Sequence, residues 1–225
     1  MNNKFCMGLV AGFLGLALLI RPLPGQQKKP LPPKAVEIRE YKGEKLDSLS
    51  QFEENSIKGP KRVDIASFRL KVTGAVAKAA VYRYQDILAR PSLAKVVTIH
   101  CVEGWDVKVL WEGVLLKDLI ADSSPRADAV TVIFKSADGY SSSLPWDYVR
   151  NRNILLAFQM NGLPVPEERG FPFVVVAEDK WGYKWAKWVT EIELSTDRDY
   201  RGYWESRGYS SNGDHSGPIF EPKKK

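Results

Sequence analysis

The segment VTIHCVEGWDVKVLW, which runs from Val97 to Trp111, decides the fold of this chain. The β-branched run at 96–99 predicts a buried strand that ends at Cys101. This is the only cysteine outside the apolar N-terminal segment, which holds Cys6. A single thiol at the end of a strand is either an inert core group or a metal ligand or nucleophile, and unpaired cysteines are most often simply buried. The residues alone leave both interpretations open.

The sequence motifs around this cysteine resemble those of a known family. HCVEGW at 100–105, followed by WEGVLL at 111–116, is similar to the molybdenum-binding loop of the sulfite oxidase fold family. The likeness is greatest to a small bacterial branch that includes the protein-methionine-sulfoxide reductase catalytic subunit. In that family the cysteine of the loop is the one protein ligand to molybdenum, so the resemblance implies this role for Cys101. Three further blocks match in the same order, and together the blocks cover about 55–214.

The second block is KWGYKWAKW at 180–188, where lysines alternate with aromatic residues. Lysines supply charge for a phosphate, and aromatic faces supply flat surfaces for a fused heterocycle. A basic surface turn with buried tryptophans explains the pattern equally well. In the resembled family, a Gly-aromatic-Lys-x-x-Lys segment holds the pterin and its terminal phosphate. The resemblance therefore implies cofactor contacts by Tyr183, Lys184, Trp185, Ala186 and Lys187.

The third block, ERGFP at 168–172, departs from the family pattern. The family has a polar residue before the glycine and an arginine two residues after the proline. Arg169 stands at the first of these positions, but Val174 stands at the second. The missing arginine removes a bidentate donor to an anion. We hypothesise that Arg169 compensates from the neighbouring position.

Shorter matches imply further cofactor contacts. Within ENSIKG at 54–59, Asn55 and Lys58 fall where the family has a segment that touches the cofactor, although the same residues suit an ordinary turn-rich loop. Ser136 aligns with a hydroxyl residue that contacts the cofactor in relatives, and it also suits a cap at a strand end. His100, beside the thiol, completes the set of cofactor-binding candidates.

Two side chains near Cys101 are candidates for catalysis with it. Glu103 follows two residues later, so in an extended loop it points to the same side as the thiol. A carboxyl group beside a metal-oxo centre in a dry pocket can carry protons, whereas an exposed one more often forms a surface ion pair. Tyr140 is predicted at the same rim. The predicted catalytic residues are thus Cys101, Glu103 and Tyr140, with Cys101 as the metal ligand.

The fourth block, DRDYRGYWESRGYSSNGD at 197–214, is rich in glycine and tyrosine. The bacterial branch carries a similar stretch near its end. It either folds over the mouth of the site or wraps loosely around the domain, and the sequence does not decide between these roles.

The remaining pattern predicts short strands and a few short helices. Strands are expected at 68–72, 129–135, 173–177 and 189–194, and helices at 81–89 and 114–121. Asn161-Gly162 predicts a hairpin between 154–159 and 163–165, because both residues accept positive φ. Strands and helices do not alternate regularly in a β-α-β order, so the predicted fold class is α+β. The resemblance specifies a sulfite-oxidase-type molybdopterin-binding fold of mixed sheets with short helices.

The N-terminal residues predict attachment to a membrane. Residues 5–20 are almost wholly apolar and are followed by Arg21-Pro22, with no small-x-small cleavage site. This favours an uncleaved anchor over a cleaved signal peptide. Basic residues after the anchor favour a cytoplasmic domain by the positive-inside rule. The resemblance slightly favours the extracytoplasmic side, because relatives often work there.

The predicted organisation has four parts. They are an anchor or signal-like segment at 1–21, a Pro/Lys-rich tether and surface segment at 22–54, the molybdopterin-binding domain at 55–214 and a flexible basic tail at 215–225. The net charge of +6 arises from scattered lysines and arginines without a nucleic-acid motif, so no nucleic-acid partner is expected. The chain also lacks a dinucleotide fingerprint, a phosphate-binding glycine loop and a Gly-x-Ser-x-Gly nucleophile motif.

The function implied by the resemblance is that of a membrane-anchored oxidoreductase with a mononuclear molybdenum–molybdopterin cofactor. It would catalyse two-electron chemistry of the oxygen-atom-transfer type on a small molecule or a sulfoxide. Because the sequence shows no haem-binding segment, electrons are expected to pass through a separate partner such as a membrane cytochrome. Two alternatives stay open: an assembly or scaffold protein that keeps the fold without catalysis, and a cofactor-free binding module in which Cys101 is merely buried.

Overall fold

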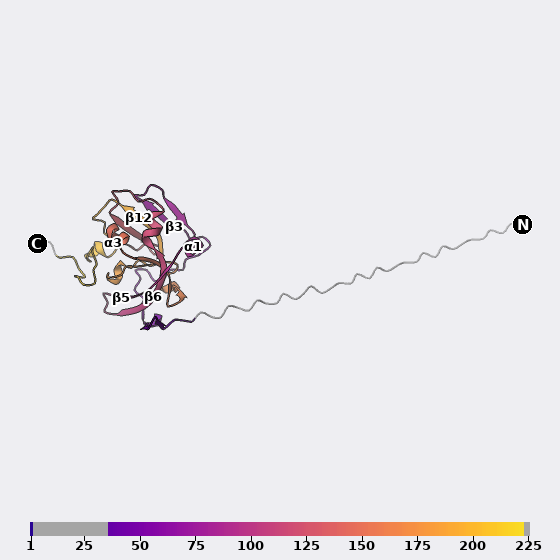
Figure 1. The fold of residues 1–225 in the computed structure, drawn as a ribbon, viewed down its shortest axis with the longest axis horizontal. Coiled ribbons are helices and arrows are strands. Elements are labelled where there is room, and N and C mark those ends of the chain that lie inside the picture. Colours follow the sequence, from indigo (N-terminus) through magenta and orange to yellow (C-terminus); the bar gives the residue numbers. More distant parts are fainter. Residues whose placement is uncertain (2–35, 223–225) are drawn as a thin grey trace. The chain divides into compact units, whose positions relative to one another are not determined.

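The computed structural model describes Met1 and residues 36–222, and Figure 1 shows the domain that residues 36–222 form. The predicted anchor after Met1, the predicted tether up to residue 35 and the last three residues of the predicted tail lie outside the described residues. Within the part that is described, no helix is both long enough and apolar enough to cross a membrane.

A mixed sheet forms one half of the domain. Among the described residues it has five strands in the order β4-β3-β12-β7-β8. They are β3 (Leu70–Gly74), β4 (Ala80–Tyr82), β7 (Thr131–Ser136), β8 (Ser141–Pro145) and β12 (Val189–Ser195). β12 pairs in parallel with β3 and antiparallel with β7, so a strand from late in the sequence lies in the middle of the sheet.

The second sheet is antiparallel and carries the cysteine hairpin. Its described strands are β5 (Leu93–His100), β6 (Asp106–Leu115), β9 (Leu155–Met160), β10 (Leu163–Pro164) and β11 (Val174–Val176). β5 pairs with β6 along its whole length, from Leu93 with Gly113 to His100 with Asp106. β9 then joins β6 to β10 and β11. A hydrophobic cluster of buried residues includes side chains from both sheets.

The other elements are short. They are the helices α1 (Tyr84–Leu88), α2 (Leu116–Ala121) and α3 (Trp146–Asn151), the 3₁₀ turns η1 (Leu49–Gln51), η2 (Glu167–Arg169), η3 (Gly182–Lys184) and η4 (Glu205–Arg207), and the small hairpin of β1 (Glu40–Tyr41) and β2 (Glu44–Lys45). One mixed sheet and one antiparallel sheet with few short helices confirm the predicted α+β class.

The predicted hairpin at Asn161-Gly162 is confirmed, with φ of 46° and 75° at its two central residues. The turn also reaches other segments, because the Asn161 side chain is fully buried. It accepts a hydrogen bond from Leu110 N (2.9 Å) and donates to Asp47 O (2.9 Å). One turn residue therefore joins three separate parts of the chain.

Two predicted helices begin later than expected. The helix expected at 81–89 begins at Tyr84, because Val81 belongs to β4. The helix expected at 114–121 begins at Leu116, because the preceding residues complete the long strand β6. In both cases one short run of residues forms the end of a strand and then a helix, and periodicity alone does not separate the two over so short a length.

Candidate functional site

Cys101 lies at the tip of the β5–β6 hairpin, in a tight turn closed by backbone hydrogen bonds. Its N–H donates to Trp105 O (2.9 Å), and Gly104 N donates to Cys101 O (3.1 Å). Gly104 has φ of 92°, a conformation that favours glycine, and no atom lies close to where a side chain would begin. Backbone conformation rather than crowding therefore explains the glycine of this turn.

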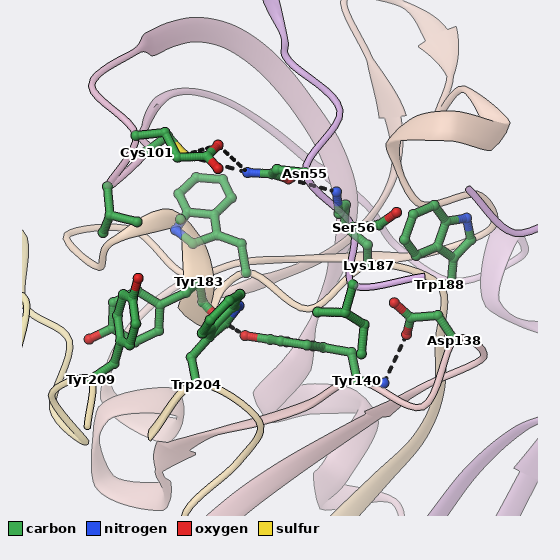
Figure 2. Close-up of a pocket in the computed structure, with 15 residues that line it drawn as sticks. Asn55, Ser56, Cys101, Asp138, Tyr140, Tyr183, Lys187, Trp188, Trp204 and Tyr209 are labelled. Atoms are coloured by element: carbon green, nitrogen blue, oxygen red, sulfur yellow. Dashed lines mark hydrogen bonds between the residues drawn. The ribbon is translucent and has the colours of Figure 1, made fainter. Parts of the chain in front are cut away.

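The turn places the thiol beside two polar side chains, and only 4% of Cys101 is exposed. Sγ lies 3.5 Å from Glu103 Oε2 and 3.5 Å from Asn55 Nδ2, and Asn55 Nδ2 also lies 3.3 Å from that carboxylate (Figure 2). The prediction that Glu103 points to the side of the thiol agrees with this geometry. A thiol, a carboxylate and an amide thus meet at one point.

Burial raises the pKa of the Cys101 thiol to about 11, and the negative charge of Glu103 acts in the same direction. Without a metal, the sulfur is therefore protonated at neutral pH. A metal ion binds the thiolate, so coordination here must displace a proton.

The raised pKa predicts slow alkylation of Cys101 in cofactor-free protein that carries Cys6→Ser. Only the thiolate reacts, so the rate with iodoacetamide should rise about tenfold per pH unit between about pH 8 and about pH 10. The alkylation rate of a small thiol of ordinary pKa, measured in parallel, should level off at about pH 9. A Cys101 rate that levels off with this control would contradict the raised pKa.

The thiol faces a cleft with an empty volume of about 680 Å³, including the part open to solvent. Five separated segments supply its walls: 55–57, the cysteine turn at 101–103, residues 138 and 140, the second block at 182–188, and residues 204 and 209. In Figure 2, Cys101 and Asn55 lie on one side of the cleft, and Tyr140 and Trp204 lie on the other. Contacts between distant segments therefore build the site.

A second cavity of about 440 Å³ adjoins this cleft and is lined by Phe52, Trp105, Trp111, Arg169 and Val174, among others. The two cavities share five lining residues, which are Asn55, Cys101, Gly182, Trp185 and Lys187. Cys101 therefore lies where the two cavities meet.

Two cations border the second cavity without a carboxylate partner among the described residues. Lys187 Nζ donates to Asn55 Oδ1 (3.1 Å), and burial lowers the pKa of this lysine. Arg169 Nη2 donates to Phe52 O (2.7 Å), while its Nη1 is buried and has no hydrogen-bond partner within the described chain. A buried cationic group without a partner suits an anionic ligand.

Seven of the predicted site residues line the cleft together. They are Asn55, Cys101, Glu103, Tyr140, Tyr183, Trp185 and Lys187. Tyr140 donates its hydroxyl to Tyr183 O, and burial raises its pKa well above the usual range. The hydroxyl is thus protonated at neutral pH and already engaged by a carbonyl. Arg169 lines the second cavity, and so does Val174, which stands where the resembled family has an arginine.

Five other predicted residues do not line the cleft. Lys58 is exposed, and the ring of His100 stacks on His215 with centroids 3.8 Å apart, in a separate hollow. Ser136 is buried, and its Oγ has no partner among the described residues. Ala186 is buried and accepts a hydrogen bond from Val175 N through its carbonyl, and Lys184 is buried in an ion pair with Glu205. Cofactor contacts by these five residues stay predictions.

The structure adds aromatic residues that the sequence did not single out. Trp188, Trp204 and Tyr209 line the cleft, and Trp105 and Trp111 line the second cavity. Asp138 also lines the cleft, and it is buried. The tyrosine- and glycine-rich fourth block was a signal for Trp204 and Tyr209, but no local pattern shows which of its aromatic residues face inward.

These features define a class of protein: a domain with a single buried thiol beside a cavity that suits an anionic, flat-ringed cofactor. Arg169 and Lys187, which have no carboxylate partner among the described residues, suit a phosphate, and the aromatic lining by Phe52 and Trp185 suits a fused ring. The residues present therefore fit molybdopterin. The chain belongs to the oxidoreductase molybdopterin binding domain family, whose family model matches residues 57–204.

Among its relatives is YuiH of Bacillus subtilis, named as an uncharacterized oxidoreductase, which is 32% identical over 152 residues. That alignment covers 67% of this chain and 76% of YuiH. The protein-methionine-sulfoxide reductase catalytic subunit MsrP of Burkholderia mallei is 30% identical over 165 residues, covering 66% of this chain and 50% of MsrP. The chain thus spans about half the length of that relative.

The sulfane dehydrogenase SoxCD of Paracoccus pantotrophus shares the fold. Its crystal structure superposes with a TM-score of 0.59 and 22% identity, covering 62% of this chain and 41% of the SoxCD chain. The predicted sulfite-oxidase-type fold is therefore confirmed.

Proposed function

We propose that this chain is a molybdenum–molybdopterin-dependent oxidoreductase in which Cys101 is the protein ligand to the metal, and that it reduces a sulfoxide by oxygen-atom transfer. One observation carries the proposal: the buried thiol of Cys101 lies where the aromatic cleft meets the cavity bordered by Arg169 and Lys187, which have no carboxylate partner within the described part of the chain. The likeness to a protein-methionine-sulfoxide reductase catalytic subunit supports the choice of substrate.

The second cavity would hold the cofactor. Arg169 offers Nη1 and Lys187 offers Nζ to the phosphate, while Phe52 already fixes the guanidinium through its carbonyl and its ring, which lies 5.6 Å away. When bound, the cofactor supplies the two-electron oxygen-atom chemistry. The pairing of Arg169 with a carbonyl rather than a carboxylate leaves its charge available to an anion.

The cleft would hold the substrate and deliver protons. Reduction of a sulfoxide to a sulfide consumes two electrons and two protons and releases water. Glu103, 3.5 Å from Sγ, is placed to pass protons from solvent, and Asn55 fixes the carboxylate by donating to it (3.3 Å). The aromatic walls of the cleft reduce the access of water to the reacting atoms.

The electrons would come from a separate protein, such as a membrane cytochrome. The relative in Burkholderia mallei is named as the catalytic subunit of its reductase. That name suits an enzyme whose electrons come from a separate protein. The apolar residues at 5–20 would hold the domain at the membrane, and we favour its extracytoplasmic side.

The proposal is tested on full-length protein from cells that make molybdopterin. We expect molybdenum and pterin near one equivalent per chain, and oxidation of a reduced dye when methionine sulfoxide is added. Protein from cells that cannot make the cofactor is the control. Absence of both molybdenum and pterin would support the cofactor-free alternative, and full loading without turnover of any sulfoxide would support the scaffold alternative.

A further inference from the structure

Residues 201–214, termed the roof segment here, cover the side of the cleft opposite the thiol. The family model matches the chain as far as residue 204, and the rest of this segment belongs to the fourth block, which resembles a stretch of the bacterial branch. Its regular structure within the described chain is the single turn η4 (Glu205–Arg207). Nevertheless it supplies Trp204 and Tyr209 to the cleft wall, as Figure 2 shows.

The two aromatic side chains form one surface with the second block. The rings of Trp204 and Tyr209 have centroids 5.1 Å apart, and Tyr209 also meets Tyr183 edge-on at 5.1 Å. Tyr183 OH donates to Ser210 O (2.8 Å), which fixes the segment on the other side of Tyr209. The roof segment and the predicted cofactor-binding block therefore hold each other in place.

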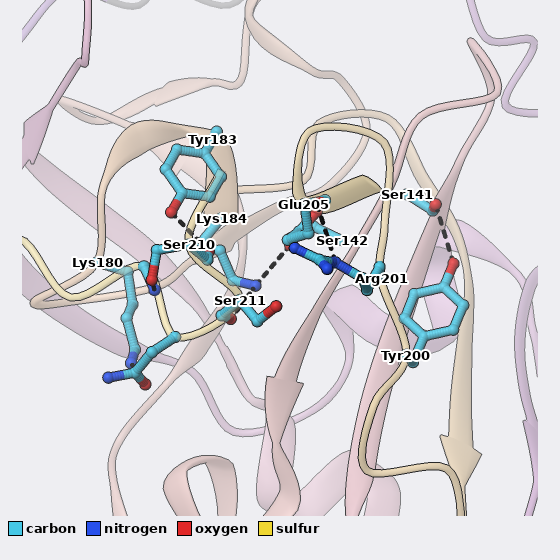
Figure 3. Close-up of polar contacts among 12 residues, drawn as sticks. Ser141, Ser142, Lys180, Tyr183, Lys184, Tyr200, Arg201, Glu205, Ser210 and Ser211 are labelled. Carbon is cyan, nitrogen blue, oxygen red and sulfur yellow. Dashed lines mark hydrogen bonds and ion pairs between the residues drawn. The ribbon is translucent and has the colours of Figure 1, made fainter. Parts of the chain in front are cut away.

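A buried ion pair fastens the roof segment to the domain (Figure 3). Lys184 Nζ lies 2.6 Å from Glu205 Oε1, and both side chains are fully buried, with 0% exposed. Ser142 Oγ of β8 donates to the same carboxylate oxygen (2.7 Å), and Lys184 Nζ also donates to Ser211 O (3.0 Å). Glu205 follows Trp204 directly, so the pair sets the position of the tryptophan at the cleft.

Close backbone contact adds a second constraint. Tyr203 N donates to Ser141 O (2.8 Å), and a Cβ at Gly202 would lie 2.3 Å from that same oxygen. Glycine is therefore required for the roof segment to approach β8 so closely. These contacts show that the roof segment packs tightly against the domain and forms part of the cleft wall, and that it does not lie loosely on the surface.

The charges in the cleft indicate which molecules fit under this roof. Among the described lining residues, Lys187 is the one cation, and it is turned toward Asn55. Glu103 and Asp138 are acidic, and the roof side is aromatic. A small anion gains nothing from such walls, whereas a neutral group with apolar or polarisable substituents packs well against aromatic faces.

We propose that the roof segment determines specificity. Trp204 and Tyr209 contact the substrate and select neutral molecules with an apolar substituent over small anions, and Glu205 is a positioning residue that holds Trp204 through Lys184. The choice of substrate rests on the function proposed above, whereas control of access to Cys101 does not.

Access to the thiol is tested without the cofactor, in full-length Cys6→Ser protein that lacks molybdopterin. Trp204→Ala/Tyr209→Ala should speed the reaction of Cys101 with a bulky maleimide by about tenfold, and the reaction with small iodoacetamide much less. Arg207→Ala, an exposed residue of the same segment outside the cleft, is the matched control. Equal acceleration of both reagents, or of neither, would overturn the role of the roof.

Specificity is tested on the loaded enzyme. The same double variant should keep its molybdenum content and lose about tenfold in kcat/KM for an aryl methyl sulfoxide, through KM, with little change for dimethyl sulfoxide. Glu205→Ala should likewise lower kcat/KM more for the aryl methyl sulfoxide than for dimethyl sulfoxide, and Glu205→Gln should restore part of that loss. Equal losses for both substrates would overturn the proposal. If the wild type binds no molybdenum, the proposed function fails, but the thiol-access result still decides whether the segment is a roof.

Discussion

Replacement of Cys101 by serine is expected to abolish molybdenum-dependent turnover. A hydroxyl oxygen is a harder donor than a thiolate and gives up its proton less readily, so the metal would lose its soft protein ligand. Removal of outer-shell partners of a metal commonly costs 10- to 100-fold, so the loss here should exceed about 100-fold. Turnover with a reduced dye, together with molybdenum and pterin analysis, measures the effect.

The matched control for this substitution is Cys6→Ser, which removes the other thiol of the chain. The control should keep its turnover and its metal. The pterin is held by Arg169 and Lys187 in our proposal, so Cys101→Ser should retain part of its pterin while its metal spectrum changes. Unchanged turnover in Cys101→Ser would show that the thiol is a core group and would contradict the ligand assignment.

Replacement of Glu205 by alanine is expected to have the largest effect on stability. Both side chains of the Lys184–Glu205 pair are fully buried, so the variant leaves a buried lysine without its counter-charge. Removal of one partner from such a pair costs about 3–5 kcal/mol in the free energy of unfolding. Lys184→Met/Glu205→Leu, which removes both charges, should cost clearly less than the sum of its single variants. This cycle compares the free energies of unfolding of the wild type, Lys184→Met, Glu205→Leu and the double variant. Denaturant unfolding of the cofactor-free proteins gives all four values.

A partly exposed pair in the same domain provides the comparison. Lys135 and Glu193 lie 2.6 Å apart with 44% and 31% of their side chains exposed. Glu193→Ala should therefore cost less than about 1 kcal/mol, because water screens exposed pairs. If Glu205→Ala costs no more than this, the buried pair does not fasten the roof segment in the way its geometry indicates.

Local patterns were sufficient to predict the α+β fold class, but they left the role of Cys101 open. The β-branched run before Cys101 forms β5, and Asn161-Gly162 forms its hairpin. The sequence does not predict β6, because the turn after Cys101 resembles the start of a loop and the strand that follows is buried without strict alternation. Resemblance to a family supplied the metal and the cofactor, which residue types alone left open.

The lysines of the second block show what a local sequence pattern cannot predict. Lys184 and Lys187 stand three residues apart in one motif, and the sequence predicts the same role for both. In the structure, η3 carries Lys184 into the interior to meet Glu205, while Lys187 borders both cavities. The difference depends on a carboxylate that lies 21 positions later in the chain. No local pattern contains that contact, and the same holds for the aromatic residues of the roof segment.

The central position of β12 has a consequence for the order of events during synthesis. β12 lies between β3 and β7, so neither neighbour can complete its pairing until residue 195 has left the ribosome. Long-range and parallel pairing of this kind forms late. The walls of the cleft need Trp204 and Tyr209 as well. A nascent chain therefore has no finished cleft until Tyr209 has left the ribosome, and the cofactor of our proposal would be inserted only after that point.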